Sequence, residues 1–385
     1  MLQRLYVHNY RCLENFEVSF KDLPSVLLVG ENGVGKSTLR KALEVFQKIG
    51  RGVSRVSHLV TKSDIIPRNL GIPTRFELEV LIGGKTYDYS LALELPNNFK
   101  EFRVLEERLS VECELVYSRS NAQVERVSGE REIQFLLDWH LVGLPMVQVY
   151  TEDDPINIFR DWLKERMIII SPIPELMHGE SREGTFELNV HATNFSDWFT
   201  AVLGEYPASY GTFYEYLKEL LPDLDYVRNE TVGKGARNIV VGFKGDQKLN
   251  LSDQKSTYLD IQFEQLSEGE KCFFICAMLI ATNEANAERN RSLFCFWDEP
   301  DNYLSLSEVR HFITSLRKVF KKNGGQILLT SHHEEAIRCF SEENTFIVDR
   351  KSHLEPSLIR LSSELRANNS QDSLIEKFIL GDVQL

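Results

Sequence analysis

The sequence contains no long hydrophobic run, and this absence limits where the protein is expected to work. No apolar stretch approaches the length of a membrane span, and the first residues lack the apolar block of a signal peptide. The six cysteines are scattered, with no C-x-x-C pair and no other metal-ligand spacing. This pattern is typical of reduced thiols in a protein core. We therefore expect a soluble, cytoplasmic protein that makes no membrane contact.

Internal repeats, low-complexity tracts and a sustained heptad pattern are also missing. A solenoid, a disordered linker and long coiled-coil arms are therefore not expected. The formal net charge of -13 argues against general binding to nucleic acid, so that any contact with DNA needs a local cationic patch. The 385 residues, 42% of them hydrophobic, are ample for a large globular core.

A glycine-rich stretch, GENGVGKST, follows the apolar residues 26–29. It fits the pattern G-x-x-x-x-G-K-[ST], and residues 36–49 after it have apolar side chains at helical spacing. A strand, a loop and a helix in this order direct backbone amides and a helix N-terminus at a polyphosphate. Lys36 would reach the β- and γ-phosphates, and the Ser37 hydroxyl would ligate Mg²⁺. The predicted nucleotide contacts are Gly30, Asn32, Gly33, Gly35, Lys36, Ser37 and Thr38.

A second apolar strand, residues 293–297, ends in two adjacent carboxylates, Asp298 and Glu299. At a strand end beside a phosphate-binding loop, Asp298 can hold Mg²⁺ and Glu299 can orient or deprotonate an attacking water. Paired acids also begin many turns. The apolar run before these two residues and the separate phosphate-binding loop favour the site.

A third buried strand, residues 326–330, leads into Ser331-His332-His333. His332 is placed to sense a γ-phosphate, whereas His333 is expected to be a structural group with its own partner. Two histidines beside Glu334 also suggest a metal site, but no further ligand spacing supports one.

The segment QLSEGEK before the apolar helix 272–281 has two explanations. Ser267 and Glu270 have the spacing of a capping box, which would only start the helix. Alternatively, Ser267, Gly269 and Glu270 contact a nucleotide at the helix N-terminus. The phosphate-binding loop elsewhere in the chain favours the second explanation.

The remaining periodicities predict an α/β fold. Residues 75–82 and 85–95 alternate around Gly83-Gly84 as a hairpin, and residues 107–117 extend the pattern. The pattern becomes helical from Gln134 to about Leu221. Three parts are predicted: residues 1–130, the N-terminal part of the core with an antiparallel β subdomain; residues 131–222, a helical insertion or lid; and residues 223–385, the C-terminal part of the core, ending in a short helix at 372–380.

Two groups of cations are candidates for contacts with DNA. One is Arg51, Arg55, Lys62 and Arg68; the other is Lys234, Arg237, Lys244 and Lys248. The first group is better explained as a solvated connection, and the second equally well as a charged hairpin.

The order of the phosphate-binding loop, Leu-Ser-x-Gly-Glu, Asp-Glu-Pro and Thr-Ser-His resembles the ATP-binding cassette (ABC) superfamily, specifically its SMC, RecF and OLD branch. Asn9-Tyr10-Arg11 is similar to that branch's N-terminal motif, which implies that Arg11 lies near the nucleotide. Residues 299–304 resemble OLD-like ATPases, including the PtuA proteins of Septu-type phage defence. The resemblance covers residues 1 to about 50 and about 258 to 349.

This resemblance implies an ABC-type ATPase that uses ATP and Mg²⁺, with Lys36, Glu299 and His332 as catalytic residues. It also implies a homodimer or a higher even oligomer. Ser267 and Gly269 of one subunit would then cap the γ-phosphate held by Lys36 of the other. ATP binding would close the dimer and hydrolysis would release it.

The sequence departs from the family pattern at several points. Its glutamine loop is not assignable, with Gln134 and Gln148 as candidates, and Glu268 stands where transporters usually carry glycine. The residues given after His332 show no sign of the acidic nuclease domain of OLD nucleases, so nuclease chemistry is not expected in this chain. We therefore expect an ATP-driven switch for a separate effector, a nuclease, in antiphage defence. The alternative is a RecF-like repair ATPase that clamps DNA directly. The spacing disfavours a transporter, and the intact Lys36, Asp298, Glu299 and His332 disfavour an inactive scaffold.

Overall fold

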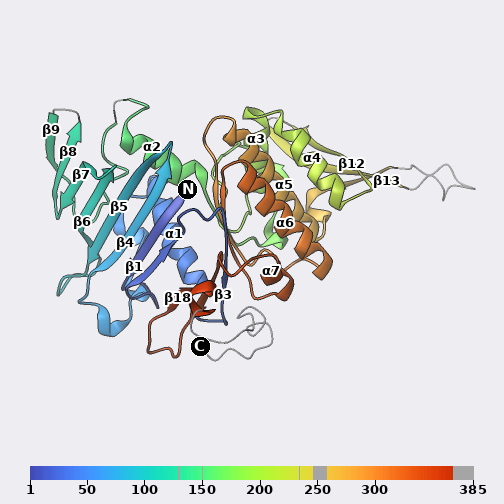
Figure 1. Ribbon diagram of the computed structural model, residues 1–385. Coiled ribbons are helices and arrows are strands. Elements are labelled where there is room, and N and C mark those ends of the chain that lie inside the picture. Colours follow the sequence, from blue (N-terminus) through green and yellow to red (C-terminus); the bar gives the residue numbers. More distant parts are fainter. Residues whose placement is uncertain (129–130, 150, 234, 246–257, 367–385) are drawn as a thin grey trace, which may run out of the picture. The chain divides into compact units, whose positions relative to one another are not determined.

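The computed structural model describes residues 1–385 except 129–130, 150, 234, 246–257 and 367–385. The chain forms two compact units, and each combines segments that are far apart in the sequence (Figure 1). Unit 1 contains Met1–Met167, Phe294–Asp298 and Gln326–Leu385, and unit 2 contains Ile168–Leu293 and Glu299–Gly325. The predicted helix at 372–380 and the candidate cations Lys234 and Lys248 lie outside the described residues. The division into three parts predicted from the sequence stays a prediction.

The first sheet of unit 1 is antiparallel, with eight strands in the order β2-β1-β4-β5-β6-β7-β8-β9. One face packs on a core, so buried and more exposed side chains alternate, most clearly along β4. The predicted turn at Gly83-Gly84 is present, with Ile82 paired to Lys85. The strands are β1 (Leu2–His8), β2 (Phe16–Ser19), β4 (Thr74–Ile82), β5 (Lys85–Glu94), β6 (Arg103–Val111), β7 (Glu114–Ser120), β8 (Gln123–Ser128) and β9 (Arg131–Leu136).

Residues 107–117, which extend the alternating pattern in the sequence, form a hairpin. Val111 of β6 pairs with Glu114 of β7, and the two residues between them, Glu112 and Cys113, have φ angles of 51° and 68°. Such two-residue turns usually contain glycine, asparagine or aspartate. Neither Glu112 nor Cys113 provides that signal, so the sequence pattern shows no break here.

The second sheet contributes the strand order β15-β16-β3-β17-β18 to unit 1. The first four strands are parallel, and β18 is antiparallel to β17. Every residue of β3, β15 and β16 is buried, which explains the apolar residues at their centres. The bounds are β3 (Ser25–Val29), β15 (Phe294–Asp298), β16 (Gln326–Thr330), β17 (Thr345–Asp349) and β18 (Leu358–Leu361).

Helix α1 (Lys36–Gly50) follows β3 and packs on the antiparallel sheet of unit 1. The ring of Phe46 contacts Phe76 and Tyr89 edge to face, with both centroid distances 6.1 Å. Near the end of the helix, the Gln47 side chain donates to the Met167 carbonyl at 2.6 Å. These contacts fix the helix that begins at the phosphate-binding loop. The other α-helices of unit 1 are α2 (Pro155–Asp161), α7 (Glu334–Arg338) and α8 (Ser362–Arg366).

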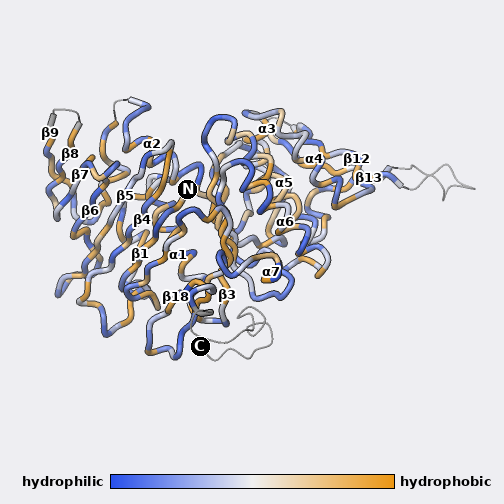
Figure 2. Tube along the Cα trace, in the orientation of Figure 1, coloured by the Kyte–Doolittle hydropathy of each residue, from blue (hydrophilic) through white to orange (hydrophobic). Residues whose placement is uncertain are grey.

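Unit 2 is built around α5 (Glu268–Ala287), whose residues are mostly buried and which Figure 2 colours largely as hydrophobic. Phe274 of α5 packs edge to face on Phe213 and Phe263. The sheet of this unit has the order β11-β13-β12, with β14 also paired to β13. The other helices of unit 2 are α3 (Phe195–Glu205), α4 (Ser209–Leu220) and α6 (Leu306–Lys322), and its strands are β11 (Glu180–Ser181), β12 (Leu224–Val232), β13 (Ala236–Lys244) and β14 (Tyr258–Gln262). Strand β10 (Met167–Ile170) begins with the last residue of the first segment of unit 1 and continues into unit 2.

Within the described part of the chain, the longest helix is α5, with 20 residues. None of the helices described is long and apolar enough to cross a bilayer. All six cysteines are free thiols, and four of them are buried. Burial raises the pKa of Cys272 to about 12, so this thiol stays protonated and unreactive at neutral pH.

Candidate functional site

Three neighbouring parallel strands of unit 1 end at the same level of the sheet. The register pairs Leu28 of β3 with Thr330 of β16, and Thr330 with Asp298 of β15. The phosphate-binding loop follows β3, and Ser331-His332 follows β16. Because the carboxyl ends of parallel strands share one edge of a sheet, the structure brings these motifs together there. Glu299 is the next residue of the chain after Asp298.

The phosphate-binding loop packs so closely on its surroundings that two positions require glycine. A Cβ at Gly30 would lie 2.2 Å from the Val348 carbonyl oxygen, and one at Gly35 would lie 2.8 Å from Ser357 Oγ. Gly35 also has a φ of 118°, which other residues rarely adopt. Ser357 donates from its amide to the Cys12 carbonyl at 2.8 Å and from its hydroxyl to the Val34 carbonyl. The loop is therefore fixed by its close contacts with Val348 and Ser357.

Lys36 and the start of α1 have the features of an anion-binding site. The buried Lys36 ammonium donates to the loop carbonyls of Gly30 and Glu31 at 2.6 and 3.0 Å. No side chain caps the helix, and its first turn contains no acidic residue. Ser37 is exposed, as are Asn32 and Gly33 at the loop tip, and Thr38 is half-buried. Amides without side-chain caps, a lysine and an exposed hydroxyl fit the phosphates of a magnesium nucleotide.

Asp298 is buried, and both of its carboxylate oxygens accept hydrogen bonds. Oδ1 accepts from the Thr330 hydroxyl at 2.6 Å, and Oδ2 accepts from Arg40 Nε at 3.0 Å. Arg40 also forms an ion pair with Glu44, one turn further along α1. Sequence reasoning missed Arg40 and Thr330. The one available signal was the spacing of Arg40, four residues after Lys36 and so on the same side of the helix.

Glu299 has an unusual backbone conformation. Its φ is 51°, in the left-handed region that residues with a Cβ seldom occupy. Its carboxylate is half-buried and accepts from Asn302 Nδ2 at 2.9 Å. Such strain costs roughly 1–3 kcal/mol and persists only where the surrounding structure imposes it, commonly at functional sites.

The two histidines after β16 have different surroundings. His332 is exposed, and the preceding residue, Ser331, donates from its amide to the Leu28 carbonyl of β3 at 3.2 Å. His333 caps α7, because its Nδ1 accepts from the Glu335 amide at 3.2 Å. That is the structural role expected for His333. Among the described residues, no group of three His, Cys, Asp or Glu side chains could hold a metal ion.

Arg11 lies in a turn that contacts the start of α1. The neighbouring Cys12 thiol is 3.6 Å from Thr38 Oγ1. The Arg11 guanidinium donates to Asp64 Oδ1 at 2.6 Å, and its amide donates to the Asp64 carbonyl at 2.7 Å. Burial, together with the Asp64 charge, raises the pKa of the adjacent Tyr10 to about 12. The turn is therefore near the phosphate-binding loop, with the arginine side chain held by Asp64.

The capping box suggested by the sequence is formed in unit 2. The Ser267 amide donates to Glu270 Oε2 at 2.7 Å, and the Glu270 amide donates to Ser267 Oγ at 3.3 Å. A Cβ at Gly269 would lie 2.9 Å from the Tyr303 carbonyl oxygen. Glycine is thus required where the start of α5 meets the turn that follows Glu299 in the chain.

Several cations proposed for DNA contacts have protein partners instead. Arg55 pairs with Glu101 at 3.1 Å, and Arg68 donates to the Leu354 carbonyl at 2.7 Å. In unit 2, Lys244 pairs with Asp225 at 2.5 Å. The glutamine candidates also have other settings: Gln134 lies in the edge strand β9, and the Gln148 carbonyl accepts from Arg126. These contacts favour the explanation of the two groups of cations as a solvated connection and a charged hairpin.

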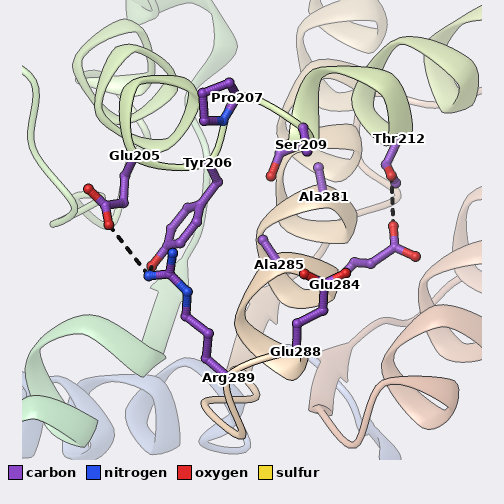
Figure 3. A pocket seen from close by; sticks show the side chains of 11 residues that line it. Glu205, Tyr206, Pro207, Ser209, Thr212, Ala281, Glu284, Ala285, Glu288 and Arg289 are labelled. Atoms are coloured by element: carbon purple, nitrogen blue, oxygen red, sulfur yellow. Dashed lines mark hydrogen bonds and ion pairs between the residues drawn. The ribbon is translucent and has the colours of Figure 1, made fainter.

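Unit 2 also contains a hollow of about 290 Å³, lined by residues of α3, α4 and α5 and the segments beside them (Figure 3). Its charged groups are three carboxylates, Glu205, Glu284 and Glu288, and one guanidinium, Arg289. Arg289 donates to Glu205 at 3.4 Å and lies over the Tyr206 ring, 4.5 Å from its centre. An excess of carboxylates repels a triphosphate, so this hollow is not assigned to a nucleotide.

Comparisons with known proteins agree with the geometry of unit 1. Residues 1–81 match the family model of an AAA ATPase domain. A crystal structure of an Smc head, bound to the C-winged helix domain of ScpA, aligns over 95% of this chain and 99% of its own, with 12% identity and a TM-score of 0.53. The chain has the fold of an SMC head. The predicted fold, an α/β core of the ABC type with an antiparallel sheet, is confirmed.

Two further SMC head structures align at lower scores. The head domain from Thermotoga maritima covers 94% of this chain and 98% of its own, with 15% identity and a TM-score of 0.46. The head from Pyrococcus furiosus, with an extended coiled coil and bound to the C-terminal domain of ScpA, covers 95% and 98%, with 12% identity and a TM-score of 0.48. A search of curated proteins gives no match. No coiled-coil arm occurs in the described part of this SMC-head fold.

Proposed function

We propose that this protein binds ATP with Mg²⁺ and hydrolyses ATP to ADP and phosphate. The alignment of Leu28, Thr330 and Asp298 supports the proposal, because it brings the phosphate-binding loop, Asp298 and the segment that contains His332 to one sheet edge. The exposed Ser37 hydroxyl and the Asp298 carboxylate are the oxygen ligands that Mg²⁺ prefers. When bound, Mg²⁺ neutralises charge on the β- and γ-phosphates.

The residues of the chain have distinct roles in this reaction. Lys36 and the amides of α1 bind the phosphates. Glu299 orients a water and accepts its proton as the water oxygen attacks the γ-phosphorus. The bond from that phosphorus to the bridging oxygen breaks, and ADP leaves with the bridging oxygen. His332 donates a hydrogen bond to the γ-phosphate.

The proposed active form is a homodimer, or a higher even oligomer, with shared ATP sites. Ser267 and Gly269 of one copy face the γ-phosphate held by Lys36 of the other. The N-terminus of α5 supports this arrangement, because a helix of 20 residues directs a partial positive charge at its start. ATP then closes the dimer, and hydrolysis opens it.

The proposed cellular role is control of a separate effector, a nuclease, in antiphage defence, as in OLD-like and PtuA-type ATPases. Two observations support control of a partner over direct clamping of DNA. The cations Arg55, Arg68 and Lys244 already have protein partners. An Smc head with the same fold is bound to a domain of another protein, ScpA. The proposed compartment is the cytoplasm.

Two measurements test these proposals. Phosphate release from ATP should be measured with and without Mg²⁺ on the purified chain, and absence of Mg²⁺-dependent release would contradict the enzymatic assignment. The native mass should be measured on protein purified from cells that express it with its genomic neighbours. A heteromer with a second chain supports effector control. A plain dimer that binds duplex DNA in a salt-dependent way would favour the RecF-like alternative.

A further inference from the structure

Three charged side chains connect the helix of the phosphate-binding loop with the end of β15. Arg40 pairs with Glu44 on α1 and with Asp298 at the strand end, where the Nε to Oδ2 distance is 3.0 Å. The Arg40 and Asp298 side chains are only 12% and 6% exposed. Thr330, which is fully buried, holds the other carboxylate oxygen at 2.6 Å. Asp298 therefore has one partner on the helix and one on the neighbouring strand.

The spacing of the charged residues along α1 relates this connection to the phosphate-binding loop. Lys36, Arg40 and Glu44 are four residues apart, so they share one side of the helix. The Lys36 ammonium contacts the phosphate-binding loop. The Arg40 guanidinium, one turn later, contacts Asp298, the residue proposed to hold Mg²⁺. One helix thus fixes both the phosphate contact and the direction of the carboxylate.

Stability alone explains this set of charges poorly. Partly buried ion pairs lose hydration, and apolar residues of similar size often stabilise a protein as well or better. The set also contains two carboxylates for one guanidinium. The surplus negative charge is suited to a site that receives a dication.

We propose that Arg40 is a positioning residue for the Mg²⁺ site, acting through Asp298. Its Nε bond, together with the Thr330 hydroxyl, fixes the plane of the carboxylate and leaves further lone pairs of both oxygens for Mg²⁺ or its water. Glu44 offsets the guanidinium charge, so that Arg40 orients Asp298 without strongly repelling the dication. This inference rests on the proposed function, because it concerns the Mg²⁺ used with ATP.

Arg40→Lys is the variant that tests the role, because lysine keeps the charge and loses the planar guanidinium. Arg103→Lys is the matched control: Arg103 is also partly buried and pairs with Glu94 at 2.7 Å, on the antiparallel sheet of unit 1. Binding of a fluorescent ATP analogue, methylanthraniloyl-ATP, would be titrated on the full chain in EDTA and across a series of Mg²⁺ concentrations. Melting temperatures would be recorded in parallel.

For Arg40→Lys, we expect affinity in EDTA within about twofold of the unchanged protein, since Lys36 and the loop are intact. The Mg²⁺ concentration that gives half of the Mg²⁺-dependent gain should rise roughly tenfold, the usual consequence of losing a residue that orients a metal ligand. Arg103→Lys should leave both quantities unchanged. If Arg40→Lys does not fold, Glu44→Gln replaces it, and its half-saturating Mg²⁺ concentration should rise about threefold, because the Arg40 charge is then unbalanced.

Two results would overturn the inference while the proposed function stands: an unchanged Mg²⁺ requirement in the tested variant, or equal losses of affinity in EDTA and in Mg²⁺, which indicate a purely structural role. A different result would overturn both. If the unchanged protein binds no nucleotide, or binds it with no gain from Mg²⁺, the proposed function fails and the Arg40 inference fails with it.

Discussion

Helices α1 and α5 both begin at a motif proposed to contact a nucleotide, but their first turns differ in chemistry. The start of α1 has glycine as its N-cap, no side-chain cap and no acid in the first turn. The start of α5 has a complete capping box and two acids, Glu268 and Glu270. An anion can therefore approach α1 directly. At α5 it meets two carboxylates, and the Glu270 amide is already bonded to Ser267, so the proposed binding there would need a second subunit that supplies the phosphate at close range.

The two helices also differ in how they are buried. Helix α1 has half-buried and exposed residues along its length, and one side carries the buried Lys36 and the half-buried Arg40 and Glu44. Helix α5 is buried nearly all round, and even Lys271 is enclosed, with its ammonium donating to the Pro174 carbonyl at 3.0 Å. We infer that α1 is chemically specialised for the nucleotide and that α5 is a rigid support for its first turn.

The largest effect on nucleotide binding should come from removing the lysine of α1. Lys36→Met should weaken binding of methylanthraniloyl-ATP about a hundredfold, because each charge-assisted hydrogen bond to phosphate is worth roughly 1.5–3 kcal/mol. Lys48→Met, on the exposed part of the same helix, should bind normally. Fluorescence titration checks both variants. Binding by Lys36→Met within threefold of normal would remove the central difference between α1 and α5.

Glu299→Gln should lower ATP hydrolysis by at least about a hundredfold while leaving ATP binding intact, since only the proton acceptor is lost. The variant should accumulate as a closed dimer in ATP and Mg²⁺, which a native mass measurement detects. Asn302→Ala, which removes the hydrogen bond to Glu299, should have a smaller effect. Equal monomer fractions with and without ATP and Mg²⁺ would contradict the role proposed for the start of α5.

Removing one negative charge from the first turn of α5 should make that helix more like α1. Glutamine also completes a capping box, so Glu270→Gln keeps the hydrogen bond to the Ser267 amide and removes a charge near the proposed γ-phosphate. The ATP concentration needed for dimerisation should fall about threefold. Glu284→Gln, at the other end of α5, serves as the control. A rise in the required ATP concentration for Glu270→Gln would show that the carboxylate itself is needed.

The smallest effect concerns stability alone. Ser267→Ala removes the side-chain cap of α5 and should lower the free energy of unfolding by about 1 kcal/mol, measured by denaturant titration. Helix α1 offers no comparable substitution, because its N-cap residue is Gly35, which has no side chain to remove. An unchanged unfolding free energy would mean that packing, not the cap, fixes the start of α5.

The fold class and the motif-bearing strands could be predicted from the sequence. Strands β3, β15 and β16 are buried at every position, and their central residues form the apolar runs that mark such strands in a sequence. The turn at Gly83-Gly84 was visible because glycine tolerates positive φ, whereas the turn at Glu112-Cys113 was not, because neither side chain marks it.

Tertiary structure alone decided the contacts between distant residues. Arg40 and Asp298 are 258 positions apart, and no local pattern connects them. The left-handed backbone of Glu299 is likewise imposed by its surroundings, since glutamate does not favour that region on its own. The division into two units also depends on which distant segments of the chain pack together. Local propensity and periodicity describe neighbours along the chain, but the site is made by neighbours in space.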